Sequence, residues 1–169
     1  MLTTRFNRAT WDEWVAQARV NGHFSYYSPR RISSTITSNC ILVLELDNDK
    51  NEVMGIGVIR NAPIHDRIDT FSRKWYNRVR YVCRRRIGRD KLDVPIKLET
   101  GEEVRLLQYL DDVCFKGRSH CKRNCGITRF PAKFKVPVDA VKKLVITECM
   151  EKPSHKMEVH TVGLEPTNL

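Results

Sequence analysis

The segment that decides the fold runs from Cys40-Ile-Leu-Val-Leu-Glu-Leu46 through Asp47-Asn-Asp-Lys-Asn51 to Val53-Met-Gly-Ile-Gly-Val-Ile59. Two apolar runs of strand length flank a polar stretch made of turn-forming residues. This pattern predicts a β-hairpin. Beyond the second strand, Asn61-Ala-Pro63 breaks the apolar pattern, so the hairpin ends there.

Residues 75–87 alternate between two faces, which predicts one half-buried strand. One face carries Trp75, Val79, Tyr81 and Cys83, and the other carries Tyr76, Arg78, Arg80, Val82 and Arg84. We expect the second face to point to solvent, because it holds most of the arginines.

Two helices are predicted from capping boxes. Thr10-Trp-Asp-Glu13 opens the first, which Asn21-Gly22 ends, and Thr100-Gly-Glu-Glu103 opens the second, which Gly117 ends. Residues 139–146 form either a short helix or a strand, and the pattern leaves both open.

The remaining segments complete an α+β architecture. Residues 26–38 and 116–135 are predicted to be loops, and residues 151–169 are predicted to be a polar tail. Residues 1–150 would form a single basic domain: a curved, largely antiparallel sheet with two or three peripheral helices.

Basic residues are concentrated in two stretches. Residues 60–91 hold 11 Lys/Arg against three Asp, and residues 116–135 hold seven Lys/Arg and no acid. The two stretches therefore carry +8 and +7, whereas the whole chain carries +10, so the rest of the chain carries about −5. Such an asymmetry indicates an anionic partner.

Aromatic residues among these arginines favour nucleic acid as that partner, because guanidinium groups bind phosphates and aromatic rings stack on bases. An acidic protein would also match the charge. The candidate nucleic-acid-binding residues are Arg73, Lys74, Tyr76, Arg78, Arg80, Arg84, Arg85, Arg86, Arg118, Lys122 and Arg123.

Gly55 and Gly57 do not form a dinucleotide-binding fingerprint. Arg60 stands where that motif needs its third glycine, and Asn61-Ala-Pro63 prevents the helix that must follow. Two glycines on one strand face indicate a bend, or a close approach by another part of the chain or a ligand.

Cys114, His120, Cys121 and Cys125 lie within twelve residues and are the ligand types that zinc prefers. Their spacing is irregular, and Cys114 falls on the apolar face of the second predicted helix, which favours a buried free thiol. We therefore expect no metal and no other cofactor. Reduced thiols are expected inside a cell, with disulfides as the alternative in an oxidised particle.

Catalytic motifs are not evident. Asp111 and Asp112 are adjacent on a predicted helix and point in different directions, and no nucleophile elbow, phosphate loop or metalloprotease motif occurs. We expect a non-enzymatic protein; a redox or zinc enzyme built on the cysteine cluster is the remaining catalytic hypothesis. No apolar run is long enough to span a membrane, and we expect no signal peptide at the N-terminus.

Two resemblances add to these inferences. Ser28-Pro-Arg-Arg-Ile32, Ile41-Leu-Val-Leu-Glu-Leu46 and Asn51-Glu-Val-Met-Gly-Ile-Gly-Val-Ile-Arg60 resemble the start of PUA-like barrels of the EVE and ASCH kind. This resemblance implies a small barrel that binds nucleic acid or a modified base, with an aromatic pocket in the EVE members. Its residues are not carried over to positions in this chain.

The second resemblance is to uncharacterised proteins of large nucleocytoplasmic DNA viruses. Tyr76-Asn-Arg-Val-Arg-Tyr81, Arg86-Ile-Gly-Arg-Asp90 and Asp112-Val-Cys-Phe-Lys-Gly-Arg-Ser-His-Cys-Lys-Arg123, with Gly126-Ile127, look like segments of those proteins. We therefore expect a viral nucleic-acid-binding protein that contacts mainly phosphates. The alternative is a minor capsid or internal packaged protein whose basic faces contact acidic neighbours. Its expected location is the host cytoplasm or nucleus, and the virion as well.

Overall fold

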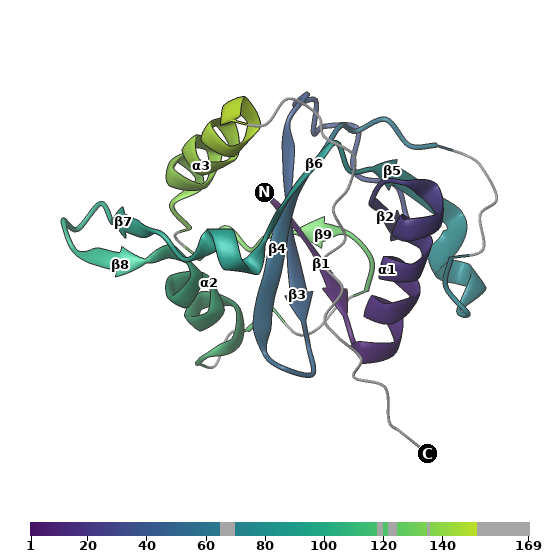
Figure 1. Cartoon of the computed structure of the whole chain (residues 1–169), viewed down its shortest axis with the longest axis horizontal. Coiled ribbons are helices and arrows are strands. Elements are labelled where there is room, and N and C mark those ends of the chain that lie inside the picture. The colour runs from purple at the N-terminus through teal and green to yellow at the C-terminus, as the bar shows by residue number, and fades with distance from the viewer. Residues whose placement is uncertain (65–69, 118–119, 122–124, 135, 152–169) are drawn as a thin grey trace, which may run out of the picture.

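The structure, a computed structural model, describes residues 1–64, 70–117, 120–121, 125–134 and 136–151 (Figure 1). The predicted tail therefore lies outside the described residues beyond position 151. The elements in chain order are β1 (Leu2–Phe6), α1 (Arg8–Asn21), β2 (Ser25–Ser28), β3 (Ile41–Asp47), β4 (Glu52–Ile59), η1 (Lys74–Arg78), β5 (Val79–Val82), β6 (Arg85–Gly88), η2 (Arg89–Leu92), β7 (Pro95–Lys97), β8 (Glu103–Arg105), α2 (Leu106–Phe115), β9 (Thr128–Arg129) and α3 (Val138–Glu151).

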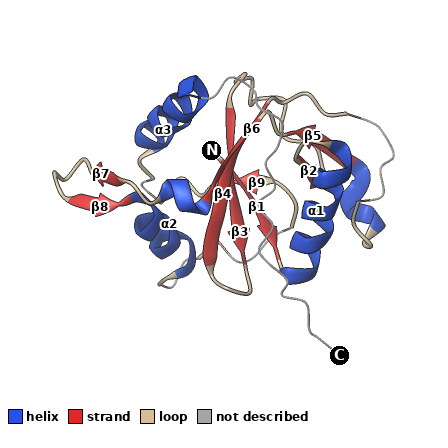
Figure 2. Cartoon of the chain, viewed as in Figure 1, coloured by secondary structure: helices blue, strands red, loops and turns tan. Residues whose placement is uncertain are grey.

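The predicted hairpin is confirmed as β3 and β4, which form the centre of a five-stranded sheet in the order β6-β4-β3-β1-β9 (Figure 2). Every pairing in this sheet is antiparallel except that of β1 with β3. Strands β2 and β5 form a second, two-stranded sheet, and β7 and β8 form a third. The α+β class with a curved, antiparallel-rich sheet is thus confirmed, and the sheets are not closed into a barrel.

Both faces of the central sheet are covered. Leu42, Leu44 and Leu46 of β3 point into one apolar cluster, which α2 and α3 complete. Ile41 and Val43 point into a second cluster, which includes side chains of α1, β2 and β5. Figure 1 shows α2 and α3 on one side of the sheet and α1, β2 and β5 on the other. Burial on both faces explains why β3 is a continuous apolar run.

The two glycines of β4 make room for a close approach by other parts of the chain. A Cβ at Gly57 would overlap the hydroxyl of Tyr26. A Cβ at Gly55 would lie 2.6 Å from the carbonyl oxygen of Ile87 and 2.7 Å from a carboxylate oxygen of Glu45. Of the two interpretations left open by the sequence, close approach is the one observed.

The first helix begins earlier than predicted. Asn7 is its N-cap: the Asn7 side chain accepts from the backbone N–H of Thr10, and the Thr10 hydroxyl accepts from the backbone N–H of Asn7. Thr10 is therefore the third residue of the helix and not its cap. The predicted end is confirmed, because Gly22 follows in the left-handed region with φ 72°.

The second predicted helix begins later. Residues Thr100 and Glu103 belong to the connection and strand of the β7–β8 hairpin, and α2 starts at Leu106. The expectation that Cys114 lies on the apolar face of this helix is confirmed, because Cys114 is buried together with Leu106 and Leu110. Residues 139–146 are helical and belong to α3.

The strands differ from the sequence predictions in three respects. Residues 75–87 are not one strand: η1 comes first, β5 then pairs with β2, and β6 pairs with β4. The change of sheet occurs at Cys83 and Arg84, whose N–H groups donate to the carbonyls of Phe24 and Val58. β2 forms where a loop was predicted, and β1 was not predicted. None of the described helices is long and apolar enough to span a membrane.

Candidate nucleic-acid interface

The segment around η1 presents exposed cations beside an exposed aromatic ring. Arg73, Lys74 and Arg78 are exposed, and none forms an ion pair with a carboxylate among the described residues. Trp75 is 40% exposed, and its ring centroid lies 4.4 Å from that of Tyr76. This arrangement offers both phosphate-binding groups and a stacking surface.

Arg80 does not lie on a solvent face, in contrast to the prediction. It is 7% exposed, and its backbone pairs with Tyr27 of β2 on one edge of β5 and with Ile64 on the other. A phosphate cannot reach a side chain so placed without rearrangement of the fold.

Arg86 also does not belong to the solvent-exposed binding face that the sequence predicted. Its Nε and Nη2 atoms donate to the buried carboxylate of Glu45 at 2.7–3.0 Å. Its guanidinium lies over the rings of Trp11, Trp14 and Phe24, at 5.1–5.6 Å from their centroids. Burial acts to lower the pKa of Arg86, but the charge of Glu45 and its hydrogen bonds with Arg86 together outweigh burial, so the pKa is raised. Arg86 is thus a partly buried cation that is paired with a fully buried carboxylate.

Other basic residues of the first stretch are neutralised by acids from elsewhere in the chain. Arg89 pairs with Asp111 at 2.9 Å, and Lys91 pairs with Glu148 at 2.6 Å. Arg84 is exposed and Arg85 is half-buried, and both lie beyond the end of β5 that is remote from η1. The predicted single basic face is therefore divided.

Arg118, Lys122 and Arg123 lie outside the described residues. The described part of their stretch approaches η1, although about fifty residues separate the two in sequence. Burial raises the pKa of Tyr76, whereas a hydrogen bond with the backbone of Gly126 lowers it. The Arg129 guanidinium donates to the Thr35 hydroxyl at 3.5 Å. The contact between Tyr76 and Gly126 thus joins the two basic stretches, whereas Arg129 contacts a residue that lies outside both.

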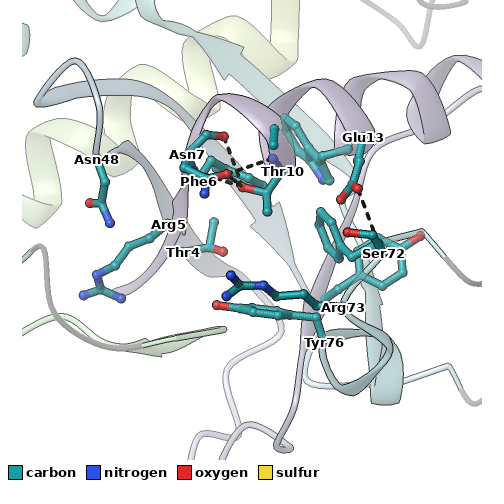
Figure 3. Close-up of a pocket in the computed structure, with 14 residues that line it drawn as sticks. Thr4, Arg5, Phe6, Asn7, Thr10, Glu13, Asn48, Ser72, Arg73 and Tyr76 are labelled. Atoms are coloured by element: carbon teal, nitrogen blue, oxygen red, sulfur yellow. Dashed lines mark hydrogen bonds between the residues drawn. The ribbon is translucent and has the colours of Figure 1, made fainter.

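A cavity of about 340 Å³ lies where β1, the first turns of α1 and residues 71–76 meet (Figure 3). Its charged lining residues are Arg5, Arg73 and Glu13. Its aromatic lining residues are Phe6, Trp14, Tyr27, Phe71 and Tyr76. Figure 3 shows Arg73 and Tyr76 extending side by side toward β1, and the cavity volume is within the range of small-molecule sites.

Arg5 is the cation at the β1 wall of this cavity and is only 9% exposed. Its Nε donates to the carbonyl oxygen of Cys121, and its Nη1 donates to the Thr128 hydroxyl at 2.9 Å. Both acceptors are neutral, and no described carboxylate forms an ion pair with Arg5. Burial lowers its pKa, but an arginine stays charged at neutral pH.

The predicted cysteine cluster is split. Cys114 and Cys121 are buried in the apolar cluster beneath α2, and Cys125 and His120 are exposed. A hydrogen bond between the two buried thiols raises the pKa of Cys114 and lowers the pKa of Cys121. Among the described residues, no three His, Cys, Asp or Glu side chains are grouped as metal ligands.

Sequence reasoning missed the cavity, and Arg5 above all. Arg5 stands in Leu2-Thr-Thr-Arg-Phe6, a stretch with too few apolar residues to predict a buried strand. The segment forms a strand because it pairs with β3 and β9, which are far away in sequence. No local signal identifies Arg5 as a buried cation. Comparison of the chain with protein-family models, curated proteins and solved structures finds no match.

Proposed function

We propose that this protein is a non-enzymatic nucleic-acid-binding module of a large DNA virus, and that it contacts mainly phosphates. The observation that carries the proposal is the η1 surface, which we define as Arg73, Lys74, Trp75, Tyr76 and Arg78. Its three cations are exposed and have no described ion pair, and the same segment carries the exposed indole ring of Trp75. The viral source rests on the sequence resemblance alone.

The chemistry of the η1 surface suits a phosphodiester backbone. Guanidinium groups donate in pairs to phosphate oxygens, and the lysine supplies a point charge. Trp75 offers a stacking face to any base, which makes binding tolerant of sequence. Nothing in this arrangement reads base edges, so we expect weak sequence preference.

The test is binding of a labelled single-stranded oligonucleotide and a duplex at several salt concentrations. We expect log K to fall linearly with log salt. The variant Arg73→Glu/Lys74→Glu/Arg78→Glu should abolish binding at moderate salt. Arg80 is left out of this variant because it is buried, so that reversing its charge would confuse unfolding with loss of contact.

A matched control carries the same charge change on the other side of the molecule. Lys97, Lys142 and Lys143 are exposed on β7 and α3, which Figure 1 places opposite η1. Their reversal to Glu should weaken binding only through long-range electrostatics and should leave the salt slope nearly unchanged. Equal losses in the two variants would contradict a contact at the η1 surface and would favour a general electrostatic attraction, such as that for an acidic protein.

A further inference from the structure

The cavity bounded by β1, α1 and residues 71–76 has two ends of opposite polarity. In Figure 3, Glu13 lies near Ser72 at one side, and Arg5 lies at the opposite side. A Glu13 carboxylate oxygen accepts from the backbone N–H of Ser72 at 3.4 Å. Arg73 extends from the same segment toward β1. The cavity therefore offers cationic donors at one end and a carboxylate acceptor at the other.

The cationic end lacks a described counter-ion. Arg5 is nine-tenths buried, and the acceptors of its hydrogen bonds, the Cys121 carbonyl and the Thr128 hydroxyl, are neutral. A buried charge is costly unless an opposite charge compensates it. An anion in the cavity would supply that charge, and the second cation, Arg73, has no described ion pair that would compete for it.

The wall between the two ends is aromatic. The rings of Tyr27 and Phe71 meet edge to face at 5.4 Å, and those of Phe71 and Tyr76 at 5.8 Å. The hydroxyl of Tyr27 is buried and has no hydrogen-bond partner among the described residues. Buried polar groups are nearly always satisfied, so this hydroxyl is available to a polar atom of a ligand.

We propose that the cavity binds one nucleoside monophosphate unit, with its phosphate against Arg5 and Arg73 and its base against the aromatic wall. Glu13 would accept from an amino group of the base or a hydroxyl of the sugar. A single ligand that carries an anion, a flat ring and hydrogen-bond donors matches all three features. The inference rests on the proposed function in one respect: the unit is either a free nucleotide or an unpaired nucleotide of a strand bound at the η1 surface.

The experiment is calorimetric titration of the whole protein with AMP, inorganic phosphate and adenosine, and with a five-nucleotide single strand. We expect AMP to bind at least about tenfold more tightly than phosphate or adenosine, because it engages both ends of the cavity. AMP binding identifies a free nucleotide as a source of the unit. Strand binding that depends on the cavity identifies an unpaired nucleotide as a source.

A steric variant separates the cavity from the charged surface. Ala9 is exposed on α1 and lines the cavity, whereas Ala16 is exposed on the same helix and does not. Ala9→Trp should block the cavity and weaken AMP binding at least about tenfold, whereas Ala16→Trp should change it less than about twofold. Neither substitution alters charge, so duplex binding at the η1 surface should persist in both variants.

A second variant tests the phosphate end. Arg5→Met keeps part of the aliphatic stem and removes the charge, and it should abolish the advantage of AMP over adenosine; unfolding is checked by circular dichroism. If AMP and the five-nucleotide strand bind equally to the wild type, Ala9→Trp and Arg73→Met, or bind none of them, the cavity proposal is wrong. If the cavity proposal fails in this way but the protein still binds a duplex, the proposed function stands. If the protein binds AMP but does not bind a duplex, only the proposed function is overturned.

Discussion

Gly57 lies against the ring of Tyr26, and this contact leaves no space for a side chain. The Tyr26 hydroxyl donates to the Glu45 carboxylate at 2.5 Å, and the same carboxylate binds Arg86. The Gly-x-Gly pair of β4 therefore accommodates a buried polar network. A motif that looks like a nucleotide-binding loop serves packing here.

Replacement of the two glycines on adjacent strands should have unequal effects. Gly57→Val should lower the free energy of unfolding by several kcal/mol, since an overpacked core that cannot relax costs about 1–3 kcal/mol or more. Gly88→Val should cost less, because the nearest atom to its Cβ is a carboxylate oxygen of Asp90 at 2.7 Å, on a side chain that can move. Urea denaturation measures both, and equal midpoints would contradict the packing described.

Cys83 is buried against the same network. Burial, followed by the charge of Glu45, raises the pKa of its thiol from 9.0 to about 12. The folded state therefore favours the neutral thiol more strongly than the unfolded state does. This contribution to stability is complete below about pH 9 and is lost as the pH rises toward 12.

Cys83→Ala should accordingly flatten the alkaline loss of stability. Between pH 9 and 12, the wild type should lose roughly 1 kcal/mol per pH unit more than the variant. The exposed Cys40 provides the control, because Cys40→Ala should follow the wild-type curve. The measurement is the urea midpoint as a function of pH. Parallel curves for wild type and Cys83→Ala would show that the thiol is not held neutral.

Strands β5 and β6 were predicted as one strand, although the alternation of apolar and polar residues on which that prediction was based is present in the structure. Val79, Tyr81 and Cys83 are buried on one face, as the period of two predicts. The chain then changes partners, from β2 to β4, and Arg86 passes to the interior beside Glu45. Alternation reports which side of a strand is apolar, but it does not report what covers the other side.

Helix α1 offers a test of its observed start. Asn7→Ala should lower the free energy of unfolding by about 1 kcal/mol, because it removes the side-chain cap on the Thr10 N–H. Thr100→Ala should be nearly neutral, because that residue, despite its capping-box sequence, precedes a strand. Thermal unfolding compares the two. A larger loss for Thr100→Ala would indicate that the second helix starts where the sequence pattern suggested.

At the level of the whole molecule, the positive charge is divided between cations that are paired within the chain and cations that are not. Arg86, Arg89 and Lys91 pair with carboxylates of the chain, whereas the cations of the η1 surface face solvent. Arg5 also has no described counter-ion, but it is buried. This division means that net charge overstates the number of groups available to a partner.

The cysteines should not hold the molecule together through a metal. Cys114 and Cys121 are buried in an apolar cluster and Cys125 is exposed, and the described residues contain no grouped ligand set. A chelator should therefore leave the melting temperature unchanged, and Cys125→Ser should be tolerated better than Cys121→Ser. Elemental analysis checks the metal directly, and near-stoichiometric zinc in protein prepared without added metal would overturn this prediction.

The sequence by itself determined the hairpin of β3 and β4, the end of α1 at Gly22 and the α+β class. It also placed Cys114 on the apolar face of α2. These features depend on local chemistry: apolar periodicity, turn residues and a glycine in the left-handed region, all of which act within a few residues. The sequence also showed that positive charge is concentrated in two stretches.

Only the tertiary structure decided which cations are available and where the cavity lies. Arg80 and Arg86 resemble Arg78 in local sequence, yet one lies between two strands and the other pairs with Glu45, 41 residues away. Arg5 becomes a cavity wall because β1 pairs with β3 and β9. Burial of a charge depends on contacts between segments that are distant in sequence, and local sequence patterns do not predict those contacts.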